Sequence, residues 1–276
     1  MNPPNHWQCG RYALALDRPL VMGIVNVTPD SFSDGGKHLD RRAAIMGARQ
    51  MLEDGADILD IGGESTRPGA KPASLSEELD RVLPVIEALS GEGVPLSVDT
   101  RKPEVMRAAI AAGAAIINDV NALQAPGALA AVAASQAGVC LMHMQGAPDT
   151  MQGDPRYDDV LVEVRDFLVE RSDACDAAGI ARARIVIDPG FGFGKTLAHN
   201  LTLLRDLDRF LETGYPVLAG LSRKSMLGAL TGRDARERLA ASIAAALLAV
   251  EKGAKVLRVH DVKETVDALK VWQAAR

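Results

Sequence analysis

The chain has little of the material from which disulfide-rich, membrane-spanning or nucleic-acid-binding proteins are built. Its three cysteines, Cys9, Cys140 and Cys175, are odd in number and far apart, which excludes a disulfide framework or cysteine metal cluster and favours a reducing compartment. No apolar run has the length of a membrane span, and the N-terminus lacks the charged-then-apolar order of a secretory signal. The net charge of −5 comes from interspersed residues of both signs, so no basic surface indicates a nucleic-acid partner. We therefore expect a cytoplasmic protein that binds neither membranes nor nucleic acids.

Eight short apolar runs stand at fairly even spacing along the chain, and helix-like stretches separate most of them. A buried parallel strand reads as a continuous apolar run, so this alternation predicts an α/β fold, a (β/α)8 TIM barrel. The predicted strands are Leu20–Val25, Ile58–Ile61, Leu96–Val98, Ile116–Ile117, Val139–Met142, Ile185–Ile187, Val217–Leu221 and Val256–Val259. Residues 6–17 alternate as a short hairpin does, covering the amino-terminal end of the barrel. The 276 residues suit a single domain, with the hairpin in residues 1–18 and the barrel in residues 19–276.

Helices are predicted after most of these strands, and several are followed by glycine. Pro103 suits the first turn of a helix. Five glycines fall just past predicted helix ends, where a left-handed residue is common: Gly55, Gly113, Gly138, Gly179 and Gly253. The stretch Leu239–Val250 is apolar nearly all round. Because a helix that is apolar on every face is buried on every face, we expect this one at a subunit contact or beneath a neighbouring helix.

Polar side chains follow the apolar runs, at the end of the barrel where the active sites of this fold lie. Asp99 and Asp188 would point into one apolar mouth, where a buried carboxylate needs a partner. A ligand with two adjacent N–H groups would satisfy such a carboxylate. Asn118 adds a donor and an acceptor, and Lys224 completes a floor that suits a heterocycle with amide and amino edges. His143 is interpreted as structural support, with Met142 as a soft contact.

The last strand ends in a pair of residues that suits an anion. Arg258 and His260 are two positions apart, so their side chains lie on the same face of the eighth strand. In a closed barrel this strand adjoins the first, which ends at Asn26. The loops after the seventh and eighth strands often form a phosphate site in this fold. Arginine can fork onto phosphate oxygens, and Asn26 can give one oxygen to Mg²⁺, which keeps water and phosphate in the rest of its shell. We expect an anion pocket here.

Three loops depart from the economical pattern of a barrel. The loops over residues 27–39 and 62–75 are long, and Phe32 and Arg67 are unusual residues for linkers, which favours a lid over a solvated connection.

The run IDPGFGFGKT fails the spacing of a phosphate-binding P-loop by one residue. We interpret it as a tight loop that lets a flat ligand approach the backbone. Its two phenylalanines, Phe191 and Phe193, either stack on that ligand or pack in the core.

Segments spread over most of the chain resemble the signature segments of dihydropteroate synthases, a family of bacterial folate-pathway enzymes. They lie between Gly23 and Val262 and read GIVNVTPDSFSDGG, DIGGESTRPGA, SVDTRKP, INDV, MHMQG, IDPGFGFGK, GLSRKSMLG and RVHDV. The resemblance implies a transferase that joins (7,8-dihydropterin-6-yl)methyl diphosphate to p-aminobenzoate, giving 7,8-dihydropteroate and diphosphate. It also implies a Mg²⁺ cofactor, a homodimer and a target of sulfonamides.

The resemblance also implies roles for individual residues. The pterin would lie against Asp99, Asn118, Met142, Asp188, Phe193 and Lys224. The diphosphate would lie against Asn26, Thr66, Arg258 and His260, with Mg²⁺ on Asn26. p-Aminobenzoate would lie against Phe32, Thr66, Arg67, Pro68 and Ser222. Arg67, Lys224 and Arg258 would be the catalytic residues.

The chemistry predicts a dissociative substitution. Diphosphate leaves readily once cations stabilise its charge, and an aromatic amine is nucleophilic without a strong base. Three alternatives are a related barrel that transfers a methyl group to a corrinoid protein, an aldolase that forms a Schiff base on Lys224, and a pterin-binding relative without catalysis. The two long loops and the absence of a corrinoid-type domain speak against the first alternative, and the intact Asn26, Arg67, Lys224 and Arg258 against the last.

Overall fold

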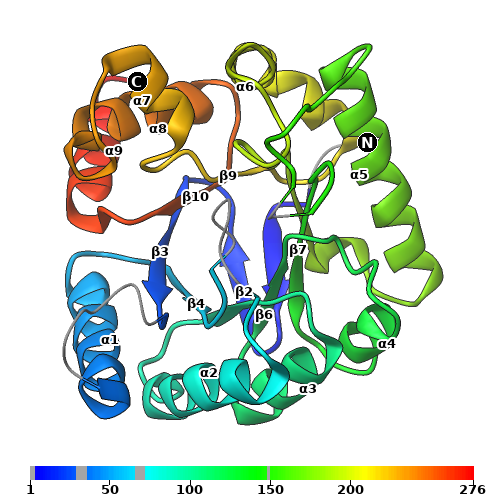
Figure 1. Cartoon of the computed structure of the whole chain (residues 1–276), viewed down its shortest axis with the longest axis vertical. Helices are drawn as coiled ribbons and strands as arrows, with labels where there is room; N and C mark the ends of the chain where they lie inside the picture. Colours follow the sequence, from blue (N-terminus) through cyan, green and yellow to red (C-terminus); the bar gives the residue numbers. More distant parts are fainter. Residues whose placement is uncertain (1–3, 29–35, 66–71, 148–149) are drawn as a thin grey trace.

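The protein is described by a computed structural model over residues 4–28, 36–65, 72–147 and 150–276. Eight parallel strands form one barrel, and helices surround it (Figure 1). The strands are β3 (Leu20–Asn26), β4 (Ile58–Gly62), β5 (Leu96–Asp99), β6 (Ile116–Asp119), β7 (Gly138–Met142), β8 (Ile185–Asp188), β9 (Leu218–Ala219) and β10 (Val256–Val259). Each coincides with a predicted apolar run, so the predicted barrel is confirmed.

The ring of strands is closed by a narrow contact. The ladder of the sheet runs β8-β7-β6-β5-β4-β3-β10-β9. A single parallel bridge between Ile187 and Val217 joins its two ends, and the backbone N–H of Ile187 donates to the carbonyl of Pro216 at 3.0 Å. The strand β9 has only two residues, so this side of the barrel has the fewest backbone hydrogen bonds between strands.

The helices follow the strands as the sequence predicts, with small shifts at their ends. They are α1 (Gly36–Glu53), α2 (Leu75–Leu89), α3 (Pro103–Ala112), α4 (Ala128–Ala133), α5 (Val160–Ala177), α6 (Leu197–Arg205), α7 (Ser225–Thr231), α8 (Leu239–Glu251) and α9 (Val262–Ala274). Local chemistry fixes several starts: Ser74 and Glu77 form a capping box before α2, and the side chain of Asp159 accepts from two backbone N–H groups of α5. The helical stretch that follows β8 divides at Asp206 into α6 and a 3₁₀ segment, Leu207–Thr213. No described helix is both long enough and apolar enough to span a bilayer.

One of the five glycine predictions is wrong. Four of those glycines have the expected positive φ, between 84° and 115°: Gly55, Gly113, Gly179 and Gly253. Gly138 instead begins strand β7, where the constraint is space. A Cβ at this position would lie 2.7 Å from the sulfur of Cys9 and 3.0 Å from the indole nitrogen of Trp7. Glycine is therefore required here because another element packs against the backbone.

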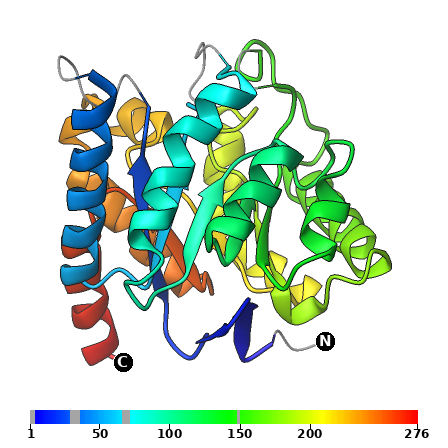
Figure 2. The ribbon, with the colours of Figure 1, turned by 90° about the horizontal axis from the view of Figure 1, so that it is seen from below.

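That element is the N-terminal hairpin, which covers the amino-terminal end of the barrel (Figure 2). It consists of β1 (His6–Cys9) and β2 (Tyr12–Ala15), paired antiparallel. Trp7 is fully buried, and its indole N–H donates to the carbonyl of Arg184 at 2.9 Å. The backbone N–H of Gly10 donates to the carbonyl of Gln136 at 2.8 Å. The predicted hairpin and its position are confirmed.

The strands separate two apolar cores. Outward-facing residues such as Leu59, Val98 and Ile117 pack beneath the helices in the larger core. Inward-facing residues pack with Trp7 and Cys9 of the hairpin in a second core: Leu20, Met22, Ile58, Ile116, Cys140, Val186, Leu218 and Val256. The inner core lies at the hairpin end, so the opposite end of the barrel interior is left for other side chains.

Candidate active site

At the carboxyl ends of the strands, the inward positions change from apolar to charged side chains. The guanidinium of Arg258 on β10 donates to Asp60 on β4 (Nε to Oδ2, 2.6 Å) and to Asp99 on β5 (Nη2 to Oδ2, 2.8 Å). The amide of Asn118 on β6 also donates to Oδ2 of Asp60, at 3.1 Å. Four strands thus contribute to one hydrogen-bonded cluster inside the barrel. We call Asp60, Asp99, Asn118 and Arg258 the inner charge cluster.

Asp60 is a site residue that the sequence analysis missed. It is fully buried and, like Arg258, lies inside a predicted apolar run rather than just after one. Its signal was the charge itself, because a carboxylate within Ile58–Ile61 cannot be part of an apolar core without a partner. Asp60 fixes two predicted site residues at once, since it accepts hydrogen bonds from Asn118 and Arg258.

The inner charge cluster shifts the protonation of its members. Burial raises the pKa of Asp99 to about 7, an effect that the charge of Arg258 opposes and the neighbouring Asp60 reinforces. Burial acts to lower the pKa of Arg258, but the two carboxylates raise it well above its ordinary value. Near neutral pH, Asp99 can therefore present either a carboxylate or a carboxyl group to a ligand, while the arginine stays charged.

A second group, Asp188, Phe193 and Lys224, lies beside the inner charge cluster. Oδ1 of Asp188, at the end of β8, accepts from the backbone N–H of Gly190 at 2.7 Å, and burial raises the pKa of its carboxyl. The ammonium of Lys224 lies 4.0 Å from the centre of the Phe193 ring, a cation–π distance. Burial lowers the pKa of Lys224 to about 8, assisted by the charge of Arg258. The arrangement offers acceptors, donors and an aromatic face within one mouth.

The structure separates the two phenylalanines whose roles the sequence left open. Phe191 is 1% exposed and packs in the larger core beneath the helices. Phe193 instead belongs to a small apolar cluster with Val120, Met142 and Met151. Phe191 is therefore a core residue, whereas Phe193 and Met142 lie together on the side of Lys224.

The third group lies after β9 and β10. The side chain of Ser222 lies 3.0 Å from Nδ1 of His260, and its oxygen accepts from the backbone N–H of His260 at 3.2 Å. Arg223, in the left-handed region with φ of 58°, pairs with Asp261. Asn26 ends β3, the neighbour of β10 in the ladder. The expected anion-binding residues Asn26, Arg258 and His260 therefore come from adjacent strands.

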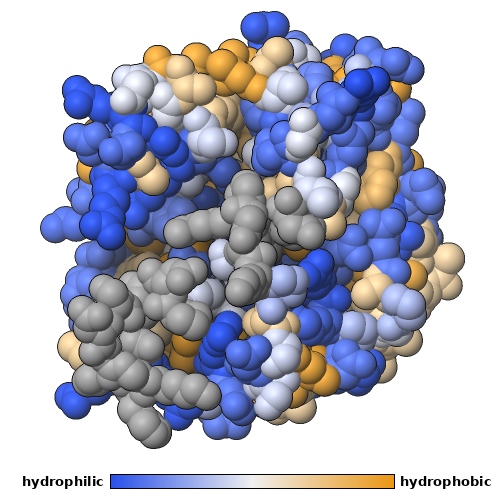
Figure 3. Space-filling model, in the orientation of Figure 1, coloured by the Kyte–Doolittle hydropathy of each residue, from blue (hydrophilic) through white to orange (hydrophobic). Residues whose placement is uncertain are grey.

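Several predicted site residues cannot be placed. Phe32, Thr66, Arg67 and Pro68 lie outside the described residues. Figure 3 shows the face on which the strands end, and its described surface is mainly hydrophilic. Among the described residues, no group of three or more His, Cys, Asp or Glu side chains is arranged to hold a metal ion.

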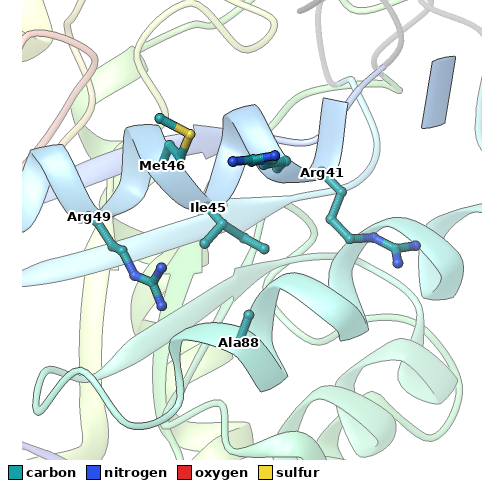
Figure 4. A pocket seen from close by; sticks show the side chains of 6 residues that line it. Arg41, Ile45, Met46, Arg49 and Ala88 are labelled. Atoms are coloured by element: carbon teal, nitrogen blue, oxygen red, sulfur yellow. The ribbon is translucent and has the colours of Figure 1, made fainter. Parts of the chain in front are cut away.

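A groove lies elsewhere, between α1 and α2, with a volume of about 420 Å³ (Figure 4). Arg41, Arg42 and Arg49 line it with the apolar side chains of α1. Arg49 already pairs with Glu92, and Arg41 donates to the carbonyl of Asp80. The groove shares no residue with the three groups at the strand ends.

Comparisons with known proteins agree with the geometry. Residues 22–260 match the family of pterin binding enzymes. The chain is 53% identical over 263 residues to the dihydropteroate synthase of Escherichia coli, an alignment that covers 95% of this chain and 93% of the relative. The chain belongs to the dihydropteroate synthase family.

Other members of the dihydropteroate synthase family are between 53% and 59% identical to this chain. The enzyme of Neisseria meningitidis serogroup C is 56% identical over 273 residues, covering 97% of this chain and 96% of the relative. The structure of Xanthomonas albilineans dihydropteroate synthase with 4-aminobenzoic acid has a TM-score of 0.93 and 59% identity, and covers 98% of both chains. That of the Burkholderia cenocepacia enzyme complexed with 7,8-dihydropteroate has a TM-score of 0.91 and 53% identity, and covers 100% of this chain and 98% of the other. The protein is therefore a transferase of folate biosynthesis, and the resemblance seen in the sequence is confirmed.

Proposed function

We propose that the open end of the barrel binds (7,8-dihydropterin-6-yl)methyl diphosphate and p-aminobenzoate and joins them into 7,8-dihydropteroate, with release of diphosphate. One observation carries the proposal: Asp99, Asn118, Asp188, Lys224 and Arg258 come from five strands or their loops, yet lie at one end of one barrel. A related enzyme has been solved with 7,8-dihydropteroate, and another with 4-aminobenzoic acid.

The pterin ring is assigned to the space between the inner charge cluster and Phe193. A pterin carries adjacent ring and amino N–H groups, which a carboxylate accepts in pairs. Asp188 and Asp99 are the buried carboxylates that suit this role, and Asn118 can both donate and accept. Lys224 supplies a donor for the carbonyl edge, while Met142 and Phe193 provide apolar faces.

The diphosphate is assigned to Asn26, Arg258 and His260, with Thr66 from the second long loop. The donor set near Asn26 fits a Mg²⁺ ion that is shared with the substrate. Asn26 offers a hard amide oxygen, and its register partner Gly62 has no side chain to fill the space beside it. Asn26 would hold the ion, which would supply positive charge against the leaving diphosphate. Arg258 and His260 act on the same leaving group from the protein side.

Catalysis then consists mainly of stabilising the departing diphosphate. As the C–O bond breaks, its electron pair leaves with the diphosphate, whose charge Arg258 and His260 stabilise. The methylene carbon shares positive charge with the dihydropterin ring, whose edges Lys224 and Asp188 hold. The amine of p-aminobenzoate attacks this carbon, and its proton passes to solvent. Closure of the two long loops would exclude water from the cation.

p-Aminobenzoate is assigned to Ser222, Phe32, Thr66, Arg67 and Pro68. Ser222 is not a nucleophile in this proposal, because the amine of p-aminobenzoate attacks the methylene carbon directly. The Ser222 oxygen accepts from the backbone N–H of His260. A sulfonamide would compete for the same place, and the Yersinia pestis enzyme, 51% identical to this chain, has been solved with a sulfonamide drug complex.

A one-step assay tests the proposed function. We expect the protein to convert the pterin diphosphate and labelled p-aminobenzoate to labelled dihydropteroate and diphosphate in equal amounts. Arg258→Lys keeps the charge but loses the fork, so turnover should fall about tenfold or more. Arg209→Lys, at an exposed ion pair with Glu212 in the 3₁₀ segment after α6, is the matched control and should leave turnover unchanged. Failure of the wild-type protein to form dihydropteroate would refute the proposal, and borohydride trapping of a carbonyl substrate on Lys224 would favour the aldolase.

The dissociative step has its own test. The pterin diphosphate is labelled with ¹⁸O at the oxygen that bridges carbon and phosphorus, and incubated without amine. If the C–O bond breaks reversibly, the label should scramble into the non-bridging positions. A label that stays in the bridge while substrate remains bound would exclude the ionised intermediate.

We further propose that the chain is a single domain, acts in the cytoplasm and forms a homodimer through α8. The helix α8 is apolar nearly all round, yet Leu239 and Leu248 are 37% and 56% exposed. Apolar side chains exposed on one face of a helix are typical of a subunit contact. Leu248→Glu should convert the dimer to a monomer in sedimentation equilibrium, whereas a dimer that persists would move the contact elsewhere.

A further inference from the structure

Lys195, at the end of the segment IDPGFGFGK, carries a buried ammonium that the proposed mechanism does not use. The residue is 3% exposed. Its Nζ lies 2.9 Å from Nδ1 of His143 and donates to the carbonyls of Gly190 and Phe193, both at 3.0 Å. A fourth contact is the carbonyl of His143 at 3.4 Å, so none of the hydrogen-bond partners of the ammonium among the described residues is a carboxylate. A buried lysine usually pairs with an acid, so a site of neutral acceptors indicates a specific task.

The partner imidazole is suited to accept a hydrogen bond. Burial lowers the pKa of His143 to about 3, and the charge of Lys195 adds to this effect. The neutral ring packs edge-on against Phe167, with their centres 4.9 Å apart. His143 is thus the structural support that the sequence analysis expected, and what it supports is Lys195.

The carbonyls that Lys195 holds belong to the loop that carries the pterin-facing groups. The backbone N–H of Gly190 donates to Asp188, and the N–H of Phe193 donates to the carbonyl of Gly190. The loop also lies against its neighbour: a Cβ on Gly190 would be 1.9 Å from the carbonyl oxygen of His143. The backbone contact expected of these glycines is therefore made by the neighbouring loop in this structure.

We propose that Lys195 is a positioning residue for the pterin, acting through the carbonyls of Gly190 and Phe193. This inference rests on the proposed function. Its ammonium draws the two carbonyls together, which orients the Gly190 N–H toward the Asp188 carboxylate and fixes the backbone that holds the Phe193 ring. Without the charge, two carbonyls and an imidazole face one another with no donor between them. The Asp188 carboxylate and the Phe193 ring, which face the proposed pterin site, then both lose their fixed positions.

The position of Lys195 in the barrel makes the effect selective. Lys195 and His143 lie in the loops after β8 and β7, whereas Ser222 and His260 follow β9 and β10. None of the four groups that contact the ammonium contacts Ser222 or His260. Burial lowers the pKa of Lys195 to about 7 against the opposing charge of Asp188, while Lys224 adds to the lowering. The charge is therefore costly to keep, which fits a role in binding rather than in stability.

The test compares Lys195→Met with Lys195→Arg, and uses Lys270→Met as the control. Met fills the space without the charge, Arg keeps the charge, and Lys270 is 69% exposed on α9. For Lys195→Met we expect the KM of the pterin diphosphate to rise about tenfold or more, while the KM of p-aminobenzoate changes less than about twofold. Calorimetric affinity for the pterin diphosphate without amine should fall by the same factor. Lys195→Arg should recover most of the loss, and Lys270→Met should match the wild-type protein.

Two results would overturn the inference: a folded Lys195→Met that binds the pterin diphosphate as the wild-type protein does, or an equal rise in both KM values. If Lys195→Met does not fold, His143→Leu removes one acceptor and should weaken pterin binding about threefold. An unchanged affinity in that variant would also refute it. Because binding is measured directly, a protein that binds the pterin selectively but makes no dihydropteroate would contradict the proposed function and leave this inference standing.

Discussion

At the hairpin end of the barrel, the inward positions hold Ile58, Ile116 and Val186, packed against Trp7. Two residues further along the same strands, the inward positions hold Asp60, Asn118 and Asp188. The two layers are about 7 Å apart, since each strand residue advances about 3.3 Å. One end therefore contributes apolar burial, while the other keeps charges out of water at a cost in stability. The comparison teaches that this barrel divides stability and recognition between its two ends.

The largest effect is expected from removing the aromatic ring at the hairpin end. Trp7→Ala leaves a cavity in the inner core and frees the carbonyl of Arg184, so the free energy of unfolding should fall by about 3–5 kcal/mol. If the two ends are independent, the affinity of the folded protein for the pterin diphosphate should stay the same. Urea unfolding and calorimetry measure the two quantities, and a parallel loss of affinity would show that the ends are coupled.

Removing a carboxylate at the open end should have the opposite effect: the affinity for the pterin should fall, while the free energy of unfolding should change little. Asp188→Ala removes an acceptor for the pterin, so binding should weaken by about 1–3 kcal/mol or more. The folded protein should lose little stability, because a buried carboxylate with a raised pKa is itself costly. Calorimetry measures the affinity, with Asp267→Asn, a change at an exposed residue of α9, as the control. An unchanged affinity would contradict the assignment of Asp188.

The pH dependence of stability sharpens the comparison further. The pKa of Asp99 is raised to about 7 by burial in the folded protein, and lies near 4 in the unfolded chain. Between these values the folded state binds one more proton, so the free energy of unfolding should fall with rising pH by up to about 1.4 kcal/mol per unit. Asp99→Asn removes this contribution.

The measurement is the difference between the unfolding free energies of the wild-type protein and Asp99→Asn, from urea titrations between about pH 5 and 7. The difference should decline as pH rises. A difference that increases with pH would mean that Arg258 outweighs burial and lowers the pKa of Asp99. The hairpin variant Trp7→Ala should keep the slope of the wild-type protein, since the hydrogen-bond partner of the indole is a backbone carbonyl, which does not titrate.

The smallest effect is expected at the boundary between the two layers. Ser97 on β5 is the register partner of Asp60, and its hydroxyl has no hydrogen-bond partner among the described residues. Ser97→Ala removes a buried polar atom that makes no bond, so the free energy of unfolding should stay the same or rise by about 1 kcal/mol or less. A loss of more than about 2 kcal/mol in urea unfolding would indicate that the hydroxyl supports Asp60.

The barrel could be predicted from the sequence because the burial and the order of the strands show in short stretches of neighbouring residues. The eight apolar runs, the hairpin and Pro103 at the start of α3 need only neighbouring residues to be interpreted. Gly138 was misinterpreted because its constraint comes from Cys9 and Trp7, more than a hundred positions away. The division into α6 and a 3₁₀ segment was not predicted, because the spacing of apolar residues does not show a change in backbone hydrogen bonds.

The candidate site was predicted in its members but not in its pairing. Asp99, Asn118, Asp188 and Arg258 were identified from their places at strand ends. That Arg258 bonds to Asp60 and Asp99 depends on the register of strands far apart in sequence, which no local pattern contains. Lys195 was overlooked because its motif was interpreted through its glycines and phenylalanines, whereas the partners of the lysine include backbone carbonyls that a sequence does not display.

The single bridge between Ile187 and Val217 is the seam of the barrel, and the proposed pterin site straddles it. Asp188 lies at the end of β8, on one side of this seam, and Lys224 lies after β9, on the other side. A ligand bound by both residues would hold β8 and β9 together, so binding would stabilise the contact between these two strands. The amide of Ile187 should then exchange its hydrogen with solvent more slowly once the site is filled. Substrate binding would thereby stabilise the part of the barrel with the fewest hydrogen bonds between strands.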